Sequence, residues 1–321
     1  MSCDNHVIGL VTRGDIVESK HHGHIAVVNH KGKLLYSAGD PSALTFFRSA
    51  LKPFQAATVL STGAAETYKV TTKELAFASS SHTSEPKHIE CLEQLLQRIK
   101  IPVTALYCGR SKHTHEGSSK IPDKAYHECS GKHVGLIAAS KEIGEDHHQV
   151  NCLHHPVQEM VLELISHYCD YTPTSVGIDG CGLPTVAIPL EQIALGYSKM
   201  GEEFGKSPIG HVAKAMSKHP WFVGGTHRFD TDIMRAFRGE VIAKKGAEGI
   251  LCMSIPSKKI GIAIKCEDGS HRPIPMAALA LLEKLNLLTK NGLHNLKQAH
   301  PHWHKVLNSR NESVGSIHST I

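Results

Sequence analysis

The sequence lacks the features that mark several specialised classes of protein. No run of five like charges occurs, and 35 basic against 30 acidic side chains give a net charge of only +5, so nucleic-acid binding gets little support. No uninterrupted apolar stretch of 18 residues occurs, so we expect no membrane-spanning helix and no membrane partner. A Gly-rich phosphate loop, an internal repeat and a long Pro/Ser tract are also missing. With 40% hydrophobic and 20% charged residues, the chain can form a globular core.

Signals of secretion are missing as well. The first residues, MSCDNHVIGLV, contain no basic leader before a long apolar stretch and no small-residue cleavage site. The nine cysteines are an odd number and lack the dense spacing of a disulfide-stapled domain. We therefore predict reduced thiols and a cytoplasmic protein.

Histidine is frequent, with 25 residues and local clusters at 21–24, 113–115 and 302–304. Clusters of this kind can bind metal. Because their spacings are irregular and match no closed zinc site, we interpret them as solvated polar residues and assign them no function.

The order of apolar patterns predicts the fold class. The length suits a single domain over residues 1–308, followed by a polar and poorly ordered tail over 309–321. Apolar runs bounded by turns predict an antiparallel β-meander over 7–40. Helical periodicity predicts helices over 49–62, from 84 onward, over 156–168 and over 275–289, and alternation predicts a strand from 258 onward. Strands first, helices next and a late returning strand favour an α+β sandwich with a largely antiparallel sheet.

An S-x-x-K pattern runs from Ser49 to Lys52 at the start of a predicted helix. A three-residue separation on a helix puts the hydroxyl and the amine on one face. A serine nucleophile needs a base, and lysine serves as one when burial or a nearby charge, such as that of Arg48, lowers its pKa. A second copy at 84–87 is better explained as a helix cap and a surface lysine.

Two further segments fit serine chemistry in combination. Residues 79–84, SSSHTS, form a dense hydroxyl cluster, and Lys265 ends an alternating apolar strand. Serine-acylating enzymes of the penicillin-binding class combine an S-x-x-K helix, a second serine loop and a lysine on a late strand, and that order is present here. The strand at Lys265 lacks their K-T-G, which weakens a β-lactamase interpretation.

A metal site is a further possibility in the middle of the chain. Residues 129–133 read CSGKH, and residues 179–184 read DGCGLP, a glycine-rich turn. Neither is a standard zinc motif. Two cysteines with Lys132 or His133 would form a thiolate-rich site, in which lysine ligates only as the neutral amine. The alternative is two buried cysteines and a lysine at a helix start.

Six blocks of sequence together resemble the rhizobial-type (class 3) L-asparaginases. They are RSALKPFQA from Arg48, SSHTSEPKH from Ser80, CSGKHVG from Cys129, DGCGLP from Asp179, GTHRFDTDIMRAF from Gly225 and IKCEDG from Ile264. The blocks follow the order of that family and span nearly the whole chain. The resemblance implies a fold like that of serine β-lactamases and glutaminases, hydrolysis of L-asparagine to aspartate and ammonia, a homodimer and a zinc ion that holds the substrate pocket.

The same resemblance implies roles for individual residues. Its two serine–lysine pairs match Ser49 with Lys52 and Ser81 with Lys265. The zinc ligands of that family match Cys129, Lys132 and Cys181. Its substrate-binding positions match Arg48, His82 and Asp179. Among the substrate-binding positions, Asp179 is the expected partner of the substrate α-amino group. Asp230 stands where some relatives are expected to have cysteine.

Two rival functions stay open at the level of sequence. One is a penicillin-recognising or glutaminase-like serine acylase. The other is a non-catalytic metal-binding protein that uses its histidines and cysteines, and the two serine–lysine pairs count against it.

Overall fold

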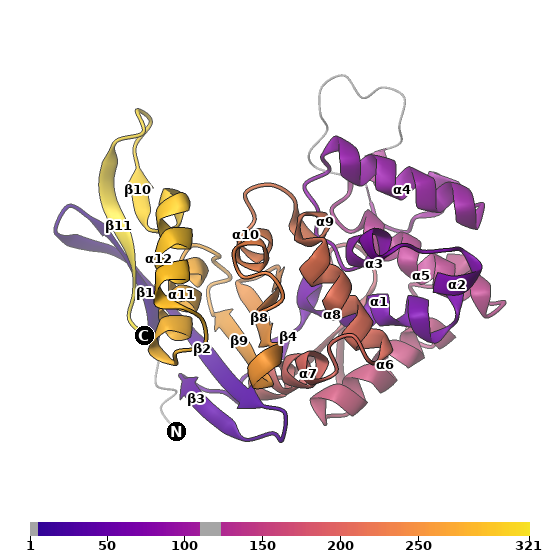
Figure 1. Cartoon of the computed structure of the whole chain (residues 1–321), viewed down its shortest axis with the longest axis horizontal. Coiled ribbons are helices and arrows are strands. Elements are labelled where there is room, and N and C mark those ends of the chain that lie inside the picture. The colour runs from indigo at the N-terminus through magenta and orange to yellow at the C-terminus, as the bar shows by residue number, and fades with distance from the viewer. Residues whose placement is uncertain (1–5, 110–122) are drawn as a thin grey trace.

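The computed structural model describes residues 6–109 and 123–321. His113 and His115, in one of the histidine clusters, lie outside the described residues. In Figure 1 the larger sheet occupies the left of the view and helices α1 to α6 gather on the right. No helix among the described residues has the length and apolarity needed to cross a membrane.

The larger sheet has eight strands, paired antiparallel in the order β10-β11-β1-β2-β9-β8-β7, with β3 also paired to β2. A smaller sheet has the order β4-β6-β5. The strands are β1 Val7–Arg13, β2 Ile16–Asn29, β3 Leu34–Ala38, β4 Leu44–Phe46, β5 Ser175–Ile178, β6 Pro184–Pro189, β7 Ile242–Gly246, β8 Ile250–Ile255, β9 Ile260–Cys266, β10 Lys305–Leu307 and β11 Ser313–Ser319. The α+β class and the largely antiparallel sheet are as predicted.

The helices cover the sheet and form a separate cluster beside it. They are α1 Lys52–Ser61, α2 Ala64–Thr67, α3 Thr72–Ala78, α4 Pro86–Ile99, α5 Ser130–Glu142, α6 Pro156–Cys169, α7 Leu190–Glu202, α8 Pro208–Lys218, α9 Pro220–Gly224, α10 Phe229–Ala236, α11 Ile274–Lys284 and α12 Lys290–Ala299. Helix α7 packs on β2, β8 and β9, whereas α1 packs against α3, α5, α6 and α8. The buried α1 is therefore held on several sides, which fixes the position of its first residue, Lys52.

The predicted elements match the structure with four differences, and three of them concern the bounds of elements. The meander is present, but residues 16–29 form one continuous strand. The helix expected over 275–289 ends at Lys284, and Asn286 adopts a left-handed conformation (φ 50°) before α12 begins. The helix expected from Ser49 starts at Lys52, because a 3-10 turn over Arg48–Leu51 comes first.

The tail expected to be poorly ordered is a strand instead. Residues Ser313–Ser319 form β11, which pairs antiparallel with β1 through partners such as Val11 and Ile317. Its side chains are mostly small or polar, so no apolar run marks it in the sequence. The pairing with β1, together with a 3.0 Å hydrogen bond between the hydroxyls of Thr12 and Ser316, orders it.

Candidate active site

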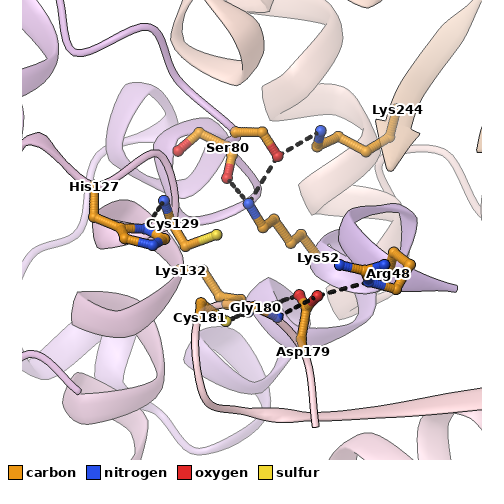
Figure 2. Close-up of polar contacts among 11 residues, drawn as sticks. Arg48, Lys52, Ser80, His127, Cys129, Lys132, Asp179, Gly180, Cys181 and Lys244 are labelled. Carbon is orange, nitrogen blue, oxygen red and sulfur yellow. Dashed lines mark hydrogen bonds and ion pairs between the residues drawn. The ribbon is translucent and has the colours of Figure 1, made fainter. Parts of the chain in front are cut away.

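The hydroxyl of Ser81 lies between two buried lysine amines. Lys52 Nζ donates to Ser81 Oγ at 2.8 Å, and Lys244 Nζ donates to the same oxygen at 3.1 Å. Lys52 is the first residue of α1, Ser81 lies in the loop between α3 and α4, and Lys244 is the middle residue of β7. Figure 2 shows the side chains of Lys52 and Lys244 both pointing at this loop, with dashed lines from the two amines to it. Both lysines are fully buried, and Ser81 is 8% exposed.

Hydrogen bonds on both sides fix the Ser81 loop. Ser81 N–H donates to the Val223 carbonyl at 2.9 Å, and His82 N–H donates to the Glu128 carbonyl at 3.1 Å. Lys52 Nζ also donates to the Ser80 carbonyl. A loop held by its own backbone keeps the Ser81 hydroxyl at one place between the two amines.

His82 supports this loop from inside the protein. Its Nδ1 accepts from the backbone N–H of Ser84 at 3.1 Å, so its Nε2 carries the proton and donates to Ser130 Oγ at 2.8 Å. Burial first, and then the neighbouring His88, hold the pKa of His82 well below its usual value. The ring is therefore neutral and 1% exposed. His82 was predicted to bind substrate, and that role stays a prediction; in the structure its two ring nitrogens bond Ser130 Oγ and Ser84 N–H.

Lys244 combines burial with a nearby carboxylate. Burial lowers the pKa of Lys244 to about 8, against the opposing effect of Asp230. The Lys244 amine and the Asp230 carboxylate are 3.5 Å apart, and both side chains are almost fully buried. The Asp230 carboxylate also accepts from the backbone N–H of Lys245 at 3.2 Å. An amine with a pKa near 8 can take up and return a proton near neutral pH.

Ser49 lies beside the same strand, in the 3-10 turn that precedes α1. It is 8% exposed. A Cβ atom at Gly246 would come within 3.0 Å of the Phe47 carbonyl and 3.1 Å of Ser49 N, so glycine lets β7 lie against this turn without displacing it. No hydrogen bond joins Ser49 Oγ to a lysine amine within residues 6–109 and 123–321. The lysine of the S-x-x-K pattern instead bonds the other serine.

Lys265 does not take the position that the sequence analysis gave it. Its amine donates to the carbonyl oxygens of Glu248, at 2.6 Å, and Cys266. It lies on β9, which β8 separates from β7. The second lysine beside Ser81 is therefore Lys244 and not Lys265. The missed signal is Lys244-Lys245-Gly246, a K-x-G sequence on a strand, which occupies the place sought for K-T-G.

Arg48 and Asp179 form an ion pair near the two serines. Arg48 Nε donates to Asp179 Oδ1 at 2.7 Å. Arg48 has a left-handed backbone conformation, with φ 49°. Burial raises the pKa of Asp179, but the charges of Lys132 and Arg48 outweigh it and keep that pKa below its usual value. The carboxylate is therefore a fixed negative charge beside the serine–lysine group.

The three predicted metal ligands lie together next to this ion pair (Figure 2). Lys132, in the first turn of α5, donates to Cys181 Sγ at 2.9 Å, and its amine is 4.0 Å from Asp179 Oδ2. A hydrogen bond with Cys181 is the largest cause that lowers the pKa of Cys129. Each of the three residues is 3% exposed. Two thiols and an amine, buried within contact distance, are a donor set that fits zinc.

Comparison with known proteins gives one family. The family model of L-asparaginase II matches residues 10–319. The search of curated proteins gives no match. Among solved structures, the chain is similar to a β-lactamase from Mycobacterium bovis, with 12% identity, 82% of this chain and 94% of that chain covered, and a TM-score of 0.45. It is also similar to a Bacillus glutaminase, with 14% identity and a TM-score of 0.45. That match covers 83% of this chain and 91% of the glutaminase chain.

The chain is thus an α+β hydrolase of the amidohydrolase type, with a serine and two lysines in contact at its centre. It belongs to the L-asparaginase II family, whose model covers nearly its whole length.

Proposed function

We propose that this protein hydrolyses the side-chain amide of L-asparagine to L-aspartate and ammonia through a serine–lysine mechanism. The observation that carries the proposal is the Ser81 hydroxyl held between the amines of Lys52 and Lys244, 2.8 and 3.1 Å away. Family membership supports the amide substrate.

The proposed reaction is acyl transfer in two steps. A serine hydroxyl attacks the amide carbon, and the relay of Ser81, Lys52 and Lys244 accepts the proton and returns it to the departing ammonia. Water then attacks the acyl-enzyme, and aspartate leaves. The attacking oxygen belongs to Ser49 or Ser81, and peptide mapping of the acyl-enzyme trapped by rapid quenching distinguishes the two. Backbone N–H groups near these serines would bind the oxyanion.

The Arg48–Asp179 pair supports recognition of an amino acid. Asparagine carries an α-carboxylate and an α-ammonium group, and the pair offers one charge for each. Asp179 would receive the α-ammonium group, because its carboxylate stays ionised and is held by Arg48 at 2.7 Å. Substrate binding would then orient the side-chain amide towards the serines.

Cys129, Lys132 and Cys181 would hold a zinc ion. When bound, zinc would supply a positive charge that fixes the Asp179 turn and, with it, the substrate pocket. The proton transfers are assigned to the lysines and serines.

Assembly and location follow from the resemblance and the thiols. We propose a homodimer, as in the rhizobial-type relatives. The eight cysteines in the described part of the chain are all free, which supports a reducing cytoplasm.

An ammonia-release assay on purified protein tests the proposal, with asparagine, glutamine and a β-lactam in parallel. Release from asparagine alone supports it. Preference for glutamine would favour a glutaminase, and hydrolysis of the β-lactam would favour a penicillin-recognising enzyme. Binding of metal without turnover of any of the three would overturn the enzymatic function.

A further inference from the structure

A second group of metal-ligating side chains lies away from the serines, where β2 meets the end of β9. His21 Nδ1 is 2.7 Å from Asp268 Oδ2, and Cys266 Sγ is 3.0 Å from Asp268 Oδ1. One potential ligand atom from each of the three residues lies within 4.8 Å of the others. The sequence analysis assigned His21 no function, because the spacing of its histidine cluster matches no closed zinc site. Its partners Cys266 and Asp268 lie 245 and 247 residues further along the chain.

The register of the sheet explains why these residues meet. Gly23 of β2 pairs with Cys266 of β9, and His21 lies two residues before Gly23, so it points to the same face of the sheet. A Cβ atom at Gly23 would come within 2.3 Å of the Lys265 carbonyl oxygen, so glycine lets β9 approach β2 closely beside Cys266. His24 lies on the opposite face, where its Nε2 bonds Glu267 at 2.9 Å.

The surroundings suit an ion that enters from solvent. Cys266 is fully buried and His21 is 7% exposed, whereas the Asp268 side chain is 48% exposed. The backbone N–H of Ser270 donates to Asp268 Oδ1 at 2.8 Å and orients the carboxylate. His21 Nε2 is buried without a hydrogen-bond partner among the described residues, so it is free to carry the ring proton if Nδ1 binds a metal.

We propose that His21, Cys266 and Asp268 bind one divalent ion of the zinc type. A thiolate, an imidazole and a carboxylate are ligands that zinc accepts, and together they carry two negative charges that balance the ion. On binding, the Cys266 thiol loses its proton to solvent, and the His21 proton moves from Nδ1 to Nε2. Three protein ligands leave the fourth position for water on the exposed side of Asp268.

This site is separate from the Cys129 group and would brace a different part of the fold. Cys266 N–H donates to the Gly249 carbonyl at 2.8 Å, and Lys265 holds the Glu248 carbonyl. Residues 247–249 follow directly on the strand that carries Lys244. The ion would therefore connect β2 and the end of β9 to the turn between β7 and β8.

Titration of the full metal-free chain with Co²⁺ tests the proposal, because a thiolate ligand gives a near-ultraviolet sulfur-to-cobalt charge-transfer band. The variants are Cys266→Ala and Asp268→Asn. The matched control is Cys252→Ala, a fully buried cysteine of the neighbouring strand β8 that belongs to neither of the metal-ligating groups found among the described residues.

We expect Cys266→Ala to lose the intensity of one thiolate–cobalt bond relative to the wild type, and Cys252→Ala to lose none. Zn²⁺ should displace the cobalt. Asp268→Asn, on the exposed turn, should keep the fold and weaken Co²⁺ binding at this site by at least about tenfold. A Cys266→Ala spectrum that superimposes on the wild type overturns the site. Equal loss in Cys252→Ala, or unchanged affinity in Asp268→Asn, overturns it even if Cys266→Ala fails to fold.

Discussion

The amine of Lys52 donates to the hydroxyl of Ser81 at 2.8 Å, although the sequence pattern places Lys52 three residues after Ser49. Ser49 lies in a 3-10 turn, and the Lys52 side chain leaves α1 in the direction of the Ser81 loop. Lys52 therefore bonds Ser81, the serine outside its own S-x-x-K pattern, and shares that hydroxyl with Lys244.

Removing either serine should abolish most of the activity. Ser49→Ala and Ser81→Ala should each lower kcat by at least about a hundredfold, the scale of losing an activated nucleophile or its proton relay. Lys52→Met should lose activity to a similar extent because it keeps the chain length but removes the base. Steady-state ammonia release measures all three, with circular dichroism as the control for folding. Near-normal turnover in both serine variants would exclude the serine–lysine mechanism.

Variants of Lys244 and Lys265 test which of them is the second catalytic lysine. The structure indicates Lys244, and the sequence analysis indicated Lys265. Lys244→Met should lower kcat by at least about a hundredfold, because it removes an amine that bonds Ser81. Lys265→Met should lower kcat by less than about tenfold, because its amine is bound to backbone carbonyls. The same assay at saturating asparagine measures both variants, and thermal unfolding shows whether Lys265→Met is merely unstable. The reverse ranking would restore Lys265 as the second catalytic lysine.

Asp230 should set the pH at which Lys244 acts. The Lys244 pKa is about 8, lowered by burial and partly restored by Asp230. Asp230→Asn removes the negative charge, so the pKa of Lys244 should fall further and the neutral amine should form at lower pH. If the neutral amine is the base, the limb on which kcat/KM rises with pH should move to lower pH. Asp232→Asn, on the same helix, is the matched control. A limb that stays in place or moves upward would contradict the role of Asp230.

The main architecture was readable from the sequence because it depends on local patterns. The turns of the meander, the helix start at Pro86 and the alternation before Lys265 are all short-range signals. Strand β11 was missed because its order comes from pairing with β1, about 300 residues away. Such long-range pairing leaves no periodicity in a polar segment.

The positions of the Cys129 group could be predicted from the blocks of sequence that resemble the family. The choice between Lys244 and Lys265 could not. Cys129, Lys132 and Cys181 come together as the blocks suggest. Lys244 and Lys265 both lie at strand positions with an apolar run nearby, and only the order of strands shows which one faces Ser81. The inward orientation of His82 was not predicted, because a serine-rich loop does not reveal which of its side chains points inward.

Asp179 should govern recognition of the substrate α-ammonium group. Asp179→Asn should raise KM for asparagine by at least about tenfold, equivalent to about 1.4 kcal/mol, with a smaller change in kcat. Succinamate, which lacks the α-amino group, provides the internal control. Wild-type protein should prefer asparagine over succinamate strongly, and the variant should lose most of that preference. An unchanged ratio of kcat/KM for the two substrates would exclude contact between Asp179 and the α-ammonium group.

Cys129, Lys132 and Cys181 should together bind one zinc ion per chain, and the ion should affect KM more than kcat. Both thiols and the Lys132 amine must lose protons to ligate, so apparent zinc affinity should weaken as pH falls, and Cys181→Ser should weaken it further. Removing the ion should loosen the turn that holds Asp179, which lies 4.0 Å from the Lys132 amine. Substrate affinity should then fall while the serine–lysine relay stays intact.

Elemental analysis of protein purified without a histidine tag, followed by chelation and kinetics, measures both effects. Cys266→Ala is the matched variant, because it removes a thiol of the other proposed site and should leave this one loaded. Absence of stoichiometric metal in the Cys266→Ala variant would show that the Cys129 group does not bind zinc. If chelation instead eliminates kcat at saturating asparagine, the ion takes part in the chemical step, and the proton transfers assigned to Lys52 and Lys244 would have to be shared with it.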